Sequence, residues 1–156
     1  MTIKCEIVTQ ERTVFSGDVD SVNLPGSEGR MGVLPNHTAL LTTLKFGEIV
    51  VHIGDQEEFF AIGGGFVEIQ PDKVIVLADS AERAEEIDIE RADKAREQAE
   101  LAMEGSSKDH NPDQYAQIQA SLMRARIRVD IGRKRAGRRR RVMAEGVQSP
   151  TSGVNN

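Results

Sequence analysis

The stretch GGGFVEIQPDKVIVLADSAERAEEIDIERADKAREQAE, residues 63–100, changes its hydrophobic period part-way along its length. Up to Ala78, apolar residues form short runs that are typical of buried or half-buried β-strands. From Ile87 onward, alanines recur at three- and four-residue steps, as they do on one face of an α-helix. The stretch therefore marks the boundary between a strand-rich N-terminal part and a helical C-terminal part, which predicts an α+β chain.

The first 78 residues show the short apolar runs and frequent turn residues of an all-β unit. Ile3, Cys5 and Ile7 alternate with more polar neighbours, and further strand-like runs cover residues 22–24, 31–34, 39–44, 48–53, 57–62, 66–70 and 73–78. Turns are expected at residues 15–18, 35–36, 46–47, 54–55, 63–65 and 71–72. Because no helical period separates these runs, they predict an antiparallel β-sandwich or barrel over residues 1–85.

The first predicted helix has recognisable ends. Asp88 is a good N-cap residue, and Ile87 before it can pack against Ala92. Gly105 is expected to end the helix in the left-handed conformation. Between these ends lies one small, smooth face, made of Ala92, Ala95, Ala99 and Ala102.

A second helix is predicted to begin at Pro112, because proline suits the first helical turn. Its apolar stripe is larger: Tyr115, Ile118, Leu122, Ala125 and Val129. A small face and a larger face joined by a short loop predict an antiparallel hairpin over residues 86–131. Such a hairpin buries little apolar area, so it needs a surface to lie on and is expected to be mobile. Residues 132–156 are expected to form a disordered basic tail.

The net charge of -5 is divided unevenly along the chain. Residues 1–123 carry about -13 and residues 124–156 about +8. Ten of the 20 Lys and Arg residues lie from 124 to 141, where Asp130 is the sole acid. A split of this kind predicts an acidic partner for the C-terminal part.

Enzymatic chemistry finds little support in the sequence. His37, His52 and His110 lie in different elements, and none has metal-ligand spacing to another histidine or to a cysteine. The glycines at 63–65 lack the Lys and Ser/Thr that follow the glycines of a phosphate-binding loop. Cys5, the sole cysteine, alternates with core residues and is expected to be inert. A binding or regulatory protein without metal or catalytic residues is therefore the predicted class.

Two further features bear on location. Residues 74–78 form the longest apolar run near the middle of the chain, far short of the roughly 20 residues that a membrane span needs. Residues 1–8 lack an apolar signal region, so a soluble, cytoplasmic chain that can dock on a membrane complex is expected.

The acids at the start of the helical part are expected to be a solvated helix start, favoured by the helix dipole: Glu82, Glu85, Glu86 and Asp88.

Two alternative functions remain open at this point. A basic run such as residues 124–141 is all that phosphate contacts to a nucleic acid require. However, aromatic residues make up 4% of the chain and none lies beside the arginines, so a stacking platform for bases is missing. A structural scaffold with a fixed hairpin is the other alternative.

Three stretches together resemble the epsilon subunit of the bacterial F-type ATP synthase. They are FSG at residues 15–17 with LPGSEGRMGVLPNHTALL at 24–41, GGGFVEI at 63–69 with VIVLAD at 74–79, and ERAEEIDIERA at 82–92. The resemblance extends over residues 2 to about 131. It implies a β-sandwich of about ten strands followed by a two-helix hairpin. It also implies a non-catalytic rotor subunit that couples proton flow to ATP synthesis at the cytoplasmic face of the cell membrane, with catalytic sites on other chains.

The resemblance implies several partners and no nucleic acid. The sandwich is expected to bind the gamma subunit and the ring of c subunits through Ser27, Glu28, Arg30, Met31 and His37. The hairpin is expected to fold beside the sandwich or to extend along gamma toward the alpha and beta subunits, where it blocks hydrolysis. Contact with an acidic segment of beta is expected from Arg133, Lys134, Arg135, Arg138, Arg139, Arg140 and Arg141.

The same resemblance implies a weak regulatory ATP site on the folded hairpin, with no other cofactor. The residues concerned are Glu82, Ile87, Asp88, Arg91, Ala92 and Arg126. Two arginines can bracket a phosphate, and carboxylates can accept hydrogen bonds from ribose or adenine. Asp88 is equally explained as a helix cap, and Arg91 as an ion-pair partner of Glu86 or Glu90. A further arginine expected one turn before Arg126 falls on Leu122.

Overall fold

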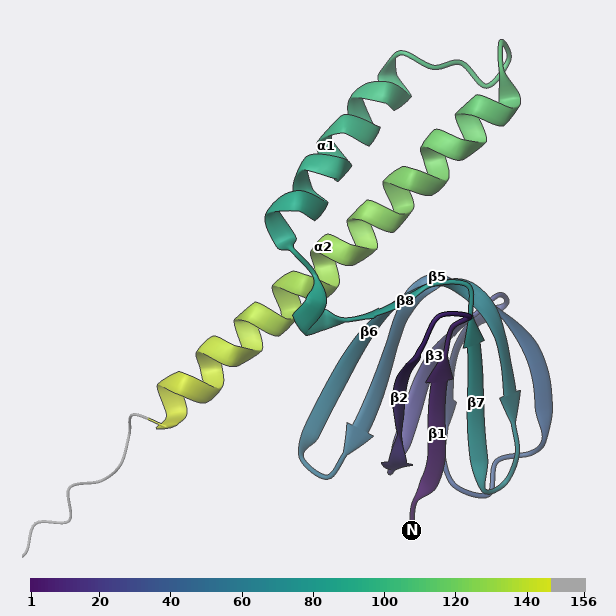
Figure 1. The fold of residues 1–156 in the computed structure, drawn as a ribbon, viewed down its shortest axis with the longest axis vertical. Helices are drawn as coiled ribbons and strands as arrows, with labels where there is room; N and C mark the ends of the chain where they lie inside the picture. Colours follow the sequence, from purple (N-terminus) through teal and green to yellow (C-terminus); the bar gives the residue numbers. More distant parts are fainter. Residues whose placement is uncertain (147–156) are drawn as a thin grey trace, which may run out of the picture.

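The computed structural model describes the backbone of residues 1–146 and the side chains of residues 1–137. In this part of the chain, eight strands are followed by a short 3-10 helix, η1, and by two α-helices, α1 and α2 (Figure 1). The strands form the sandwich, and the helices form an antiparallel hairpin attached at the end of the sandwich opposite the N-terminus. The predicted order of a β-sandwich followed by a two-helix hairpin is confirmed.

The strands belong to one hydrogen-bonded sheet that folds over into two layers. Their bounds are β1 Ile3–Val8, β2 Thr13–Val19, β3 Ser21–Gly26, β4 Gly29–Val33, β5 Leu40–Ile53, β6 Gln56–Ile69, β7 Lys73–Ala78 and β8 Ala81–Arg83. The pairing order is β2-β1-β7-β6-β5-β3-β4, and β8 pairs with β6. The first half of β5 and the second half of β6 lie with β7, β1 and β2. Their other halves lie with β3, β4 and β8.

The turns predicted at residues 46–47 and 63–65 are wrong, because β5 and β6 continue through them. Phe46 pairs with Gly63, and Leu44 with Gly65. Gly64 and Gly65 have φ values of +97° and +134°, and a Cβ at Gly65 would collide with the carbonyl oxygen of Leu77. Glycine therefore bends β6 between the layers without ending it. The described residues form eight strands where about ten were expected, because β5 and β6 each span two predicted strands.

Two other strand expectations are corrected. Residues 15–18, predicted as a turn, lie inside β2, where Gly17 pairs with Cys5. Phe15 packs edge-on against Phe60 with the ring centroids 5.6 Å apart, so it belongs to the core. In addition, β1 pairs antiparallel with β2 but parallel with β7, so the sheet is mixed.

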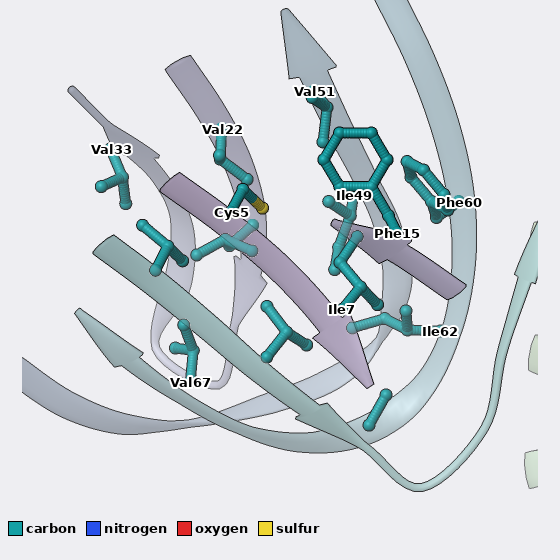
Figure 2. Close-up of a cluster of buried hydrophobic side chains, with 14 of the residues drawn as sticks. Cys5, Ile7, Phe15, Val22, Val33, Ile49, Val51, Phe60, Ile62 and Val67 are labelled. Atoms are coloured by element: carbon teal, nitrogen blue, oxygen red, sulfur yellow. The ribbon is translucent and has the colours of Figure 1, made fainter. Parts of the chain in front are cut away.

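The core lies between the two layers and follows from the alternation of each strand. Ile3, Cys5 and Ile7 on β1 are each at most 1% exposed. Figure 2 shows Cys5 and Ile7 among apolar side chains from both layers, including Val67 and Phe60. Burial raises the pKa of the Cys5 thiol from 9.0 to about 12, so the expectation of an inert core cysteine agrees with the structure.

The helices begin as predicted but differ in their faces and ends. Their bounds are η1 Ala84–Glu86, α1 Ile89–Glu104 and α2 Pro112–Gly146. The Asp88 carboxylate accepts a hydrogen bond from the Arg91 backbone N–H at 3.1 Å, which confirms the N-cap. The predicted left-handed Gly105 is wrong, because its φ is -86°. Ala92 and Ala99 are buried, whereas Ala95 and Ala102 are exposed, so the packed face of α1 is narrower than predicted.

Helix α2 is longer than the sequence pattern predicted. The expected disordered tail began at residue 132, but the helix continues through the basic run to Gly146. Arginine and lysine are good helix formers, and Lys134 in this part of α2 contacts Glu48 of β5. Residues 147–156 lie outside the described part of the chain. In that described part, neither helix is long and apolar enough to cross a membrane.

Candidate functional site

One face of α2 lies on the end of the sandwich, near β5, β6 and β8 (Figure 1). The guanidinium carbon of Arg124 lies 5.3 Å from the centre of the Phe46 ring on β5. One turn later, Arg128 donates to the Glu82 carboxylate of β8 from Nε at 2.8 Å and from Nη2 at 3.1 Å. Cationic side chains of α2 therefore contact an aromatic ring of the sandwich and form hydrogen bonds with one of its carboxylates.

A small apolar cluster lies beneath these polar contacts. Ile131 of α2 is 1% exposed and packs in a cluster with Ala61 of β6 and Ala84 of η1. Ile87, Ala92 and Val129 complete the cluster. It is separate from the sandwich core, so the hairpin is attached by a limited apolar contact and is not part of the main core.

A second face of α2 packs against α1. Leu122, Ala125 and Val129 are buried there, as the predicted stripe requires. Gly132 extends this face, since a Cβ at Gly132 would lie 2.8 Å from the Ile89 Cγ1 atom. The absence of a side chain at Gly132 therefore allows α2 to approach the start of α1 closely.

The acids of the linker between sandwich and hairpin are ion-paired, which corrects the expectation of a solvated helix start. Glu82 pairs with Arg128, and Oε1 of Glu85 lies 3.0 Å from Nη2 of Arg135. Glu86 accepts two hydrogen bonds, of 2.9 and 2.6 Å, from the guanidinium of Arg12 in the β1–β2 turn. These bonds from Arg12 hold the pKa of Glu86 below its ordinary value. The sequence pattern did not reveal them because the partners are 46 to 74 residues apart.

The outer surface of the sandwich carries an exposed apolar patch, formed by Leu41, Phe66 and Leu77. Their exposed fractions are 71%, 54% and 57%. Phe66 lies directly opposite Leu77 in the β6–β7 register, and Leu41 lies on the same face of β5. Exposed apolar side chains gathered on one face commonly mark a protein interface. The sequence pattern did not lead to a prediction of this patch. Alternation along β5, β6 and β7 does place the three side chains on the face opposite the core.

Comparison with known proteins agrees with this architecture. Residues 2–84 match the family "ATP synthase, Delta/Epsilon chain, beta-sandwich domain", and residues 85–132 match "ATP synthase, Delta/Epsilon chain, long alpha-helix domain". The chain belongs to the ATP synthase delta/epsilon family.

Two curated relatives align with this chain over almost their whole length. A Dehalococcoides mccartyi protein named "ATP synthase epsilon chain" is 48% identical over 139 residues, which cover 85% of this chain and 94% of the relative. One with the same name from Herpetosiphon aurantiacus is 44% identical, over 88% of this chain and 99% of the relative. A chain in the solved Euglena gracilis mitochondrial ATP synthase, OSCP/F1/c-ring in rotational state 1, aligns with a TM-score of 0.68 at 25% identity, over 78% of this chain and 76% of that chain.

Residues predicted to contact gamma and the c ring lie along the β3–β4 hairpin and the loop after β4. Ser27 and Glu28 are exposed at the hairpin turn, and the Ser27 hydroxyl lies 2.6 Å from the Thr43 hydroxyl of β5. The Arg30 guanidinium donates to the Glu48 carbonyl oxygen at 3.3 Å. Met31 and His37 are half-buried. Because β5 carries both Thr43 and Leu41, Ser27 lies next to the strand that bears part of the exposed patch.

The residues predicted to bind ATP are not gathered at one point in this conformation. Ile87 and Ala92 lie in the small apolar cluster, and Asp88 caps α1. Arg91 is exposed. The Nη2 atom of Arg126 lies 3.5 Å from Glu100.

Glu82 and Arg126 also line two different hollows. Arg126 lines a groove of about 250 Å³ between α1 and α2, with Met103 and Gln119 among its neighbours. Glu82 lines a hollow of about 440 Å³ between α2 and the sandwich, together with Ser80 and Arg124. ATP binding in the family manner therefore stays a prediction for this chain.

Three of the residues predicted to contact beta have partners within the chain. Arg133 lies 3.7 Å from Asp93, Lys134 lies 3.1 Å from Glu48, and Arg135 lies 3.0 Å from Glu85. The side chains of Arg138, Arg139, Arg140 and Arg141 lie outside the described residues, although their backbone belongs to α2. The sequence analysis considered only Asp130 as an internal partner and so missed the acids on other elements.

Proposed function

We infer that this chain is a non-catalytic central-stalk subunit of a proton-translocating F-type ATP synthase. The observation that carries this proposal is the combination of a well-packed sandwich with a hairpin attached through a small apolar cluster, a few ion pairs and the Arg124–Phe46 contact. The family relationship supports it, as does the solved mitochondrial relative, which belongs to an assembly of OSCP, F1 and a c-ring. In this role the chain transmits rotation and lies at the cytoplasmic face of the cell membrane through its complex.

The sandwich is the anchor in this proposal. Leu41, Phe66 and Leu77 provide apolar area for the gamma subunit, and the neighbouring turn at Ser27 and Glu28 provides polar contacts for the c ring. A few well-packed side chains at the centre of an interface contribute most of the affinity in typical complexes, and burial of apolar area there is favourable. The sandwich needs no contribution from the hairpin to present this surface.

The hairpin is the regulatory part in this proposal. It can leave the sandwich at the cost of one small cluster and a few ion pairs, while the core of the sandwich stays intact. Once extended, it reaches toward the alpha and beta subunits and blocks rotation in the hydrolysis direction. A protein that binds nucleic acid is disfavoured because Arg126, Arg128 and residues 133–135 are engaged with carboxylates.

Weak ATP binding to the folded hairpin is a secondary part of the proposal. Asp88 and Arg91 stand at the exposed start of α1, where a nucleotide can approach them. Titration of the isolated chain with ATP, followed by amide chemical shifts, tests this directly. A saturable change at Arg91 or Arg126 below millimolar ATP supports the site. The absence of any such change at millimolar ATP rejects it.

Truncation tests the division of labour. A chain ending at residue 85 should bind gamma as tightly as the full chain, and complexes containing it should hydrolyse ATP faster than complexes with the full chain. If the truncated sandwich is folded by circular dichroism but does not bind gamma, the sandwich is not the part that binds gamma. Equal hydrolysis rates would reject the inhibitory role of the hairpin.

A further inference from the structure

We propose that the basic face of α2 is an internal electrostatic latch, which holds the hairpin on the sandwich and withholds the same cations from any external acidic partner while the hairpin is folded. The latch is formed by Arg128, Lys134 and Arg135 with Glu82, Glu48 and Glu85. Its effect on hydrolysis rests on the proposed function, whereas its effect on the hairpin does not.

The ion pairs of α2 fall into two groups according to where their acids lie. Arg126 and Arg133 pair with Glu100 and Asp93, which are on α1. Such pairs move with the hairpin and cannot resist its departure. Arg128 and Lys134 pair with acids on β8 and β5, so these contacts bridge the sandwich and the hairpin. Arg135 pairs with Glu85 on the linker helix η1, whose Glu86 is bonded to Arg12 of the sandwich.

Two of the three latch cations, Arg128 and Arg135, share one face of α2, whereas Lys134 lies about 100° round the helix from Arg135. Arg128 and Arg135 are seven residues apart, or close to two helical turns, and the buried Ile131 lies between them. Arg124 continues the same face toward Phe46. The face therefore alternates cationic and apolar contacts to the sandwich, whereas the opposite apolar stripe of α2 packs on α1.

The surroundings of the pairs decide which of them matters most. Both side chains of the Arg128–Glu82 pair are 27% exposed, and two hydrogen bonds join them. Glu48 is 14% exposed, although its partner Lys134 is 58% exposed. Partly buried, doubly bonded pairs are screened less by water and salt than exposed pairs. Arg128–Glu82 is thus the principal contact, and Arg135 is weaker because its buried Nε atom has no hydrogen-bond partner.

The two possible uses of these cations compete with each other. While the hairpin is docked, both oxygens of Glu82 occupy the Nε–Nη2 edge of Arg128, so this edge cannot bind a carboxylate of another subunit. Extension of the hairpin therefore exchanges internal carboxylates for external ones, so the acids of the sandwich set how readily extension occurs. Added salt screens both sets of contacts, and it cannot by itself distinguish them.

The test follows the docking equilibrium in the isolated full-length chain. The chain contains no tryptophan, so Phe46→Trp places a single indole beneath Arg124 as a fluorescent reporter of docking. In this background, Glu82→Gln should raise the ratio of undocked to docked hairpin about threefold to tenfold. The triple variant Glu48→Gln/Glu82→Gln/Glu85→Gln should raise it at least tenfold. Amide shifts of Ile131 in the chain that retains Phe46 provide a second, independent readout.

Two control variants separate the latch from a general loss of charge or stability. Glu97→Gln removes an equivalent negative charge from an exposed position on α1 and should leave the ratio within twofold of the unchanged chain. The exchanged pair Glu82→Arg/Arg128→Glu should return the ratio at least halfway from the value of Glu82→Arg alone. An unchanged ratio in the folded triple variant, or an exchanged pair no better than Glu82→Arg, would overturn the latch.

Reconstituted complexes distinguish the latch from the proposed function. The acid triple variant should inhibit ATP hydrolysis more strongly than the unchanged chain, because its hairpin is released with all its cations. A shifted docking equilibrium without any change in hydrolysis supports the latch and rejects the inhibitory role. An unchanged docking equilibrium rejects the latch whatever the hydrolysis rate.

Discussion

Arg128 of α2 and Glu82 of β8 form a two-bond ion pair, with 2.8 Å from Nε to Oε2 and 3.1 Å from Nη2 to Oε1. The pair joins residues 46 positions apart and ties the hairpin to the last strand of the sandwich. Its neighbours on α2 make similar contacts to Glu48 and Glu85. The fold is thus a packed core with an appendage held by one small apolar cluster and by polar side chains.

The close approach of the two helices depends on Gly132. Replacing Gly132 with alanine puts a Cβ 2.8 Å from Ile89 Cγ1, so Ile89 must shift and α2 must move away from α1. We expect a loss of about 1–3 kcal/mol in hairpin stability, measured by thermal unfolding followed at the helical circular dichroism band. Gly137→Ala is the matched control, because its Cβ would meet nothing within 4 Å. That change should stabilise α2 by up to about 1 kcal/mol, and equal effects at the two glycines would contradict the packing.

The exposed patch should determine gamma binding. Phe66→Ser and Leu77→Ser should each weaken binding of the isolated subunit to gamma by about tenfold or more, because they remove apolar area from the centre of the interface. Stability of the free chain should change little, since both side chains are more than half exposed. Leu101→Ser, at an equally exposed leucine of α1, serves as control and should leave binding unchanged. Calorimetric titration with gamma gives the comparison, and a larger effect at Leu101 would refute the placement.

The buried thiol predicts a particular response to alkaline pH. Cys5 has a folded pKa of about 12 and an ordinary value of 9.0, so the unfolded chain releases its proton first as pH rises. The contribution of the protonated thiol is complete below pH 9.0 and is lost between pH 9.0 and about 12, by up to about 1.4 kcal/mol per pH unit. Urea unfolding at several pH values should show this slope in the unchanged chain and a shallower one in Cys5→Ala. Identical slopes would mean that Cys5 is accessible to water.

Much of the fold was predictable because it depends on local patterns. The alternation of Ile3, Cys5 and Ile7 indicates a half-buried strand, and Asp88 and Pro112 mark true helix starts. The turns predicted around Phe46 and Gly63 were wrong because a glycine-containing sequence is compatible both with the end of a strand and with a bend within it. What decides between the two is pairing across β5 and β6, which is a long-range property.

The hairpin contacts were harder to predict for the same reason. The spacing of Arg124, Arg128 and Arg135 is visible in the sequence as one helical face, but their partners Phe46, Glu82 and Glu85 belong to other elements. A local count of charges on α2 finds only Asp130 and so suggests unpaired cations. The three-dimensional arrangement supplies the missing acids.

The most direct test of the regulatory account measures ATP hydrolysis and ATP synthesis on the same membrane vesicles. The variant replaces seven of the ten basic residues of the run at 124–141 with glutamine, at positions 133–135 and 138–141. It removes the Lys134 and Arg135 latch contacts and any contact of these seven residues with an external acid, and it retains the Arg128–Glu82 pair. The docked hairpin is therefore weakened, and the extended hairpin cannot bind firmly elsewhere. The account predicts faster hydrolysis than with the unchanged chain and nearly unchanged synthesis. Unchanged hydrolysis, in vesicles that retain the subunit in full amount, would contradict the account and leave the chain a coupling subunit alone.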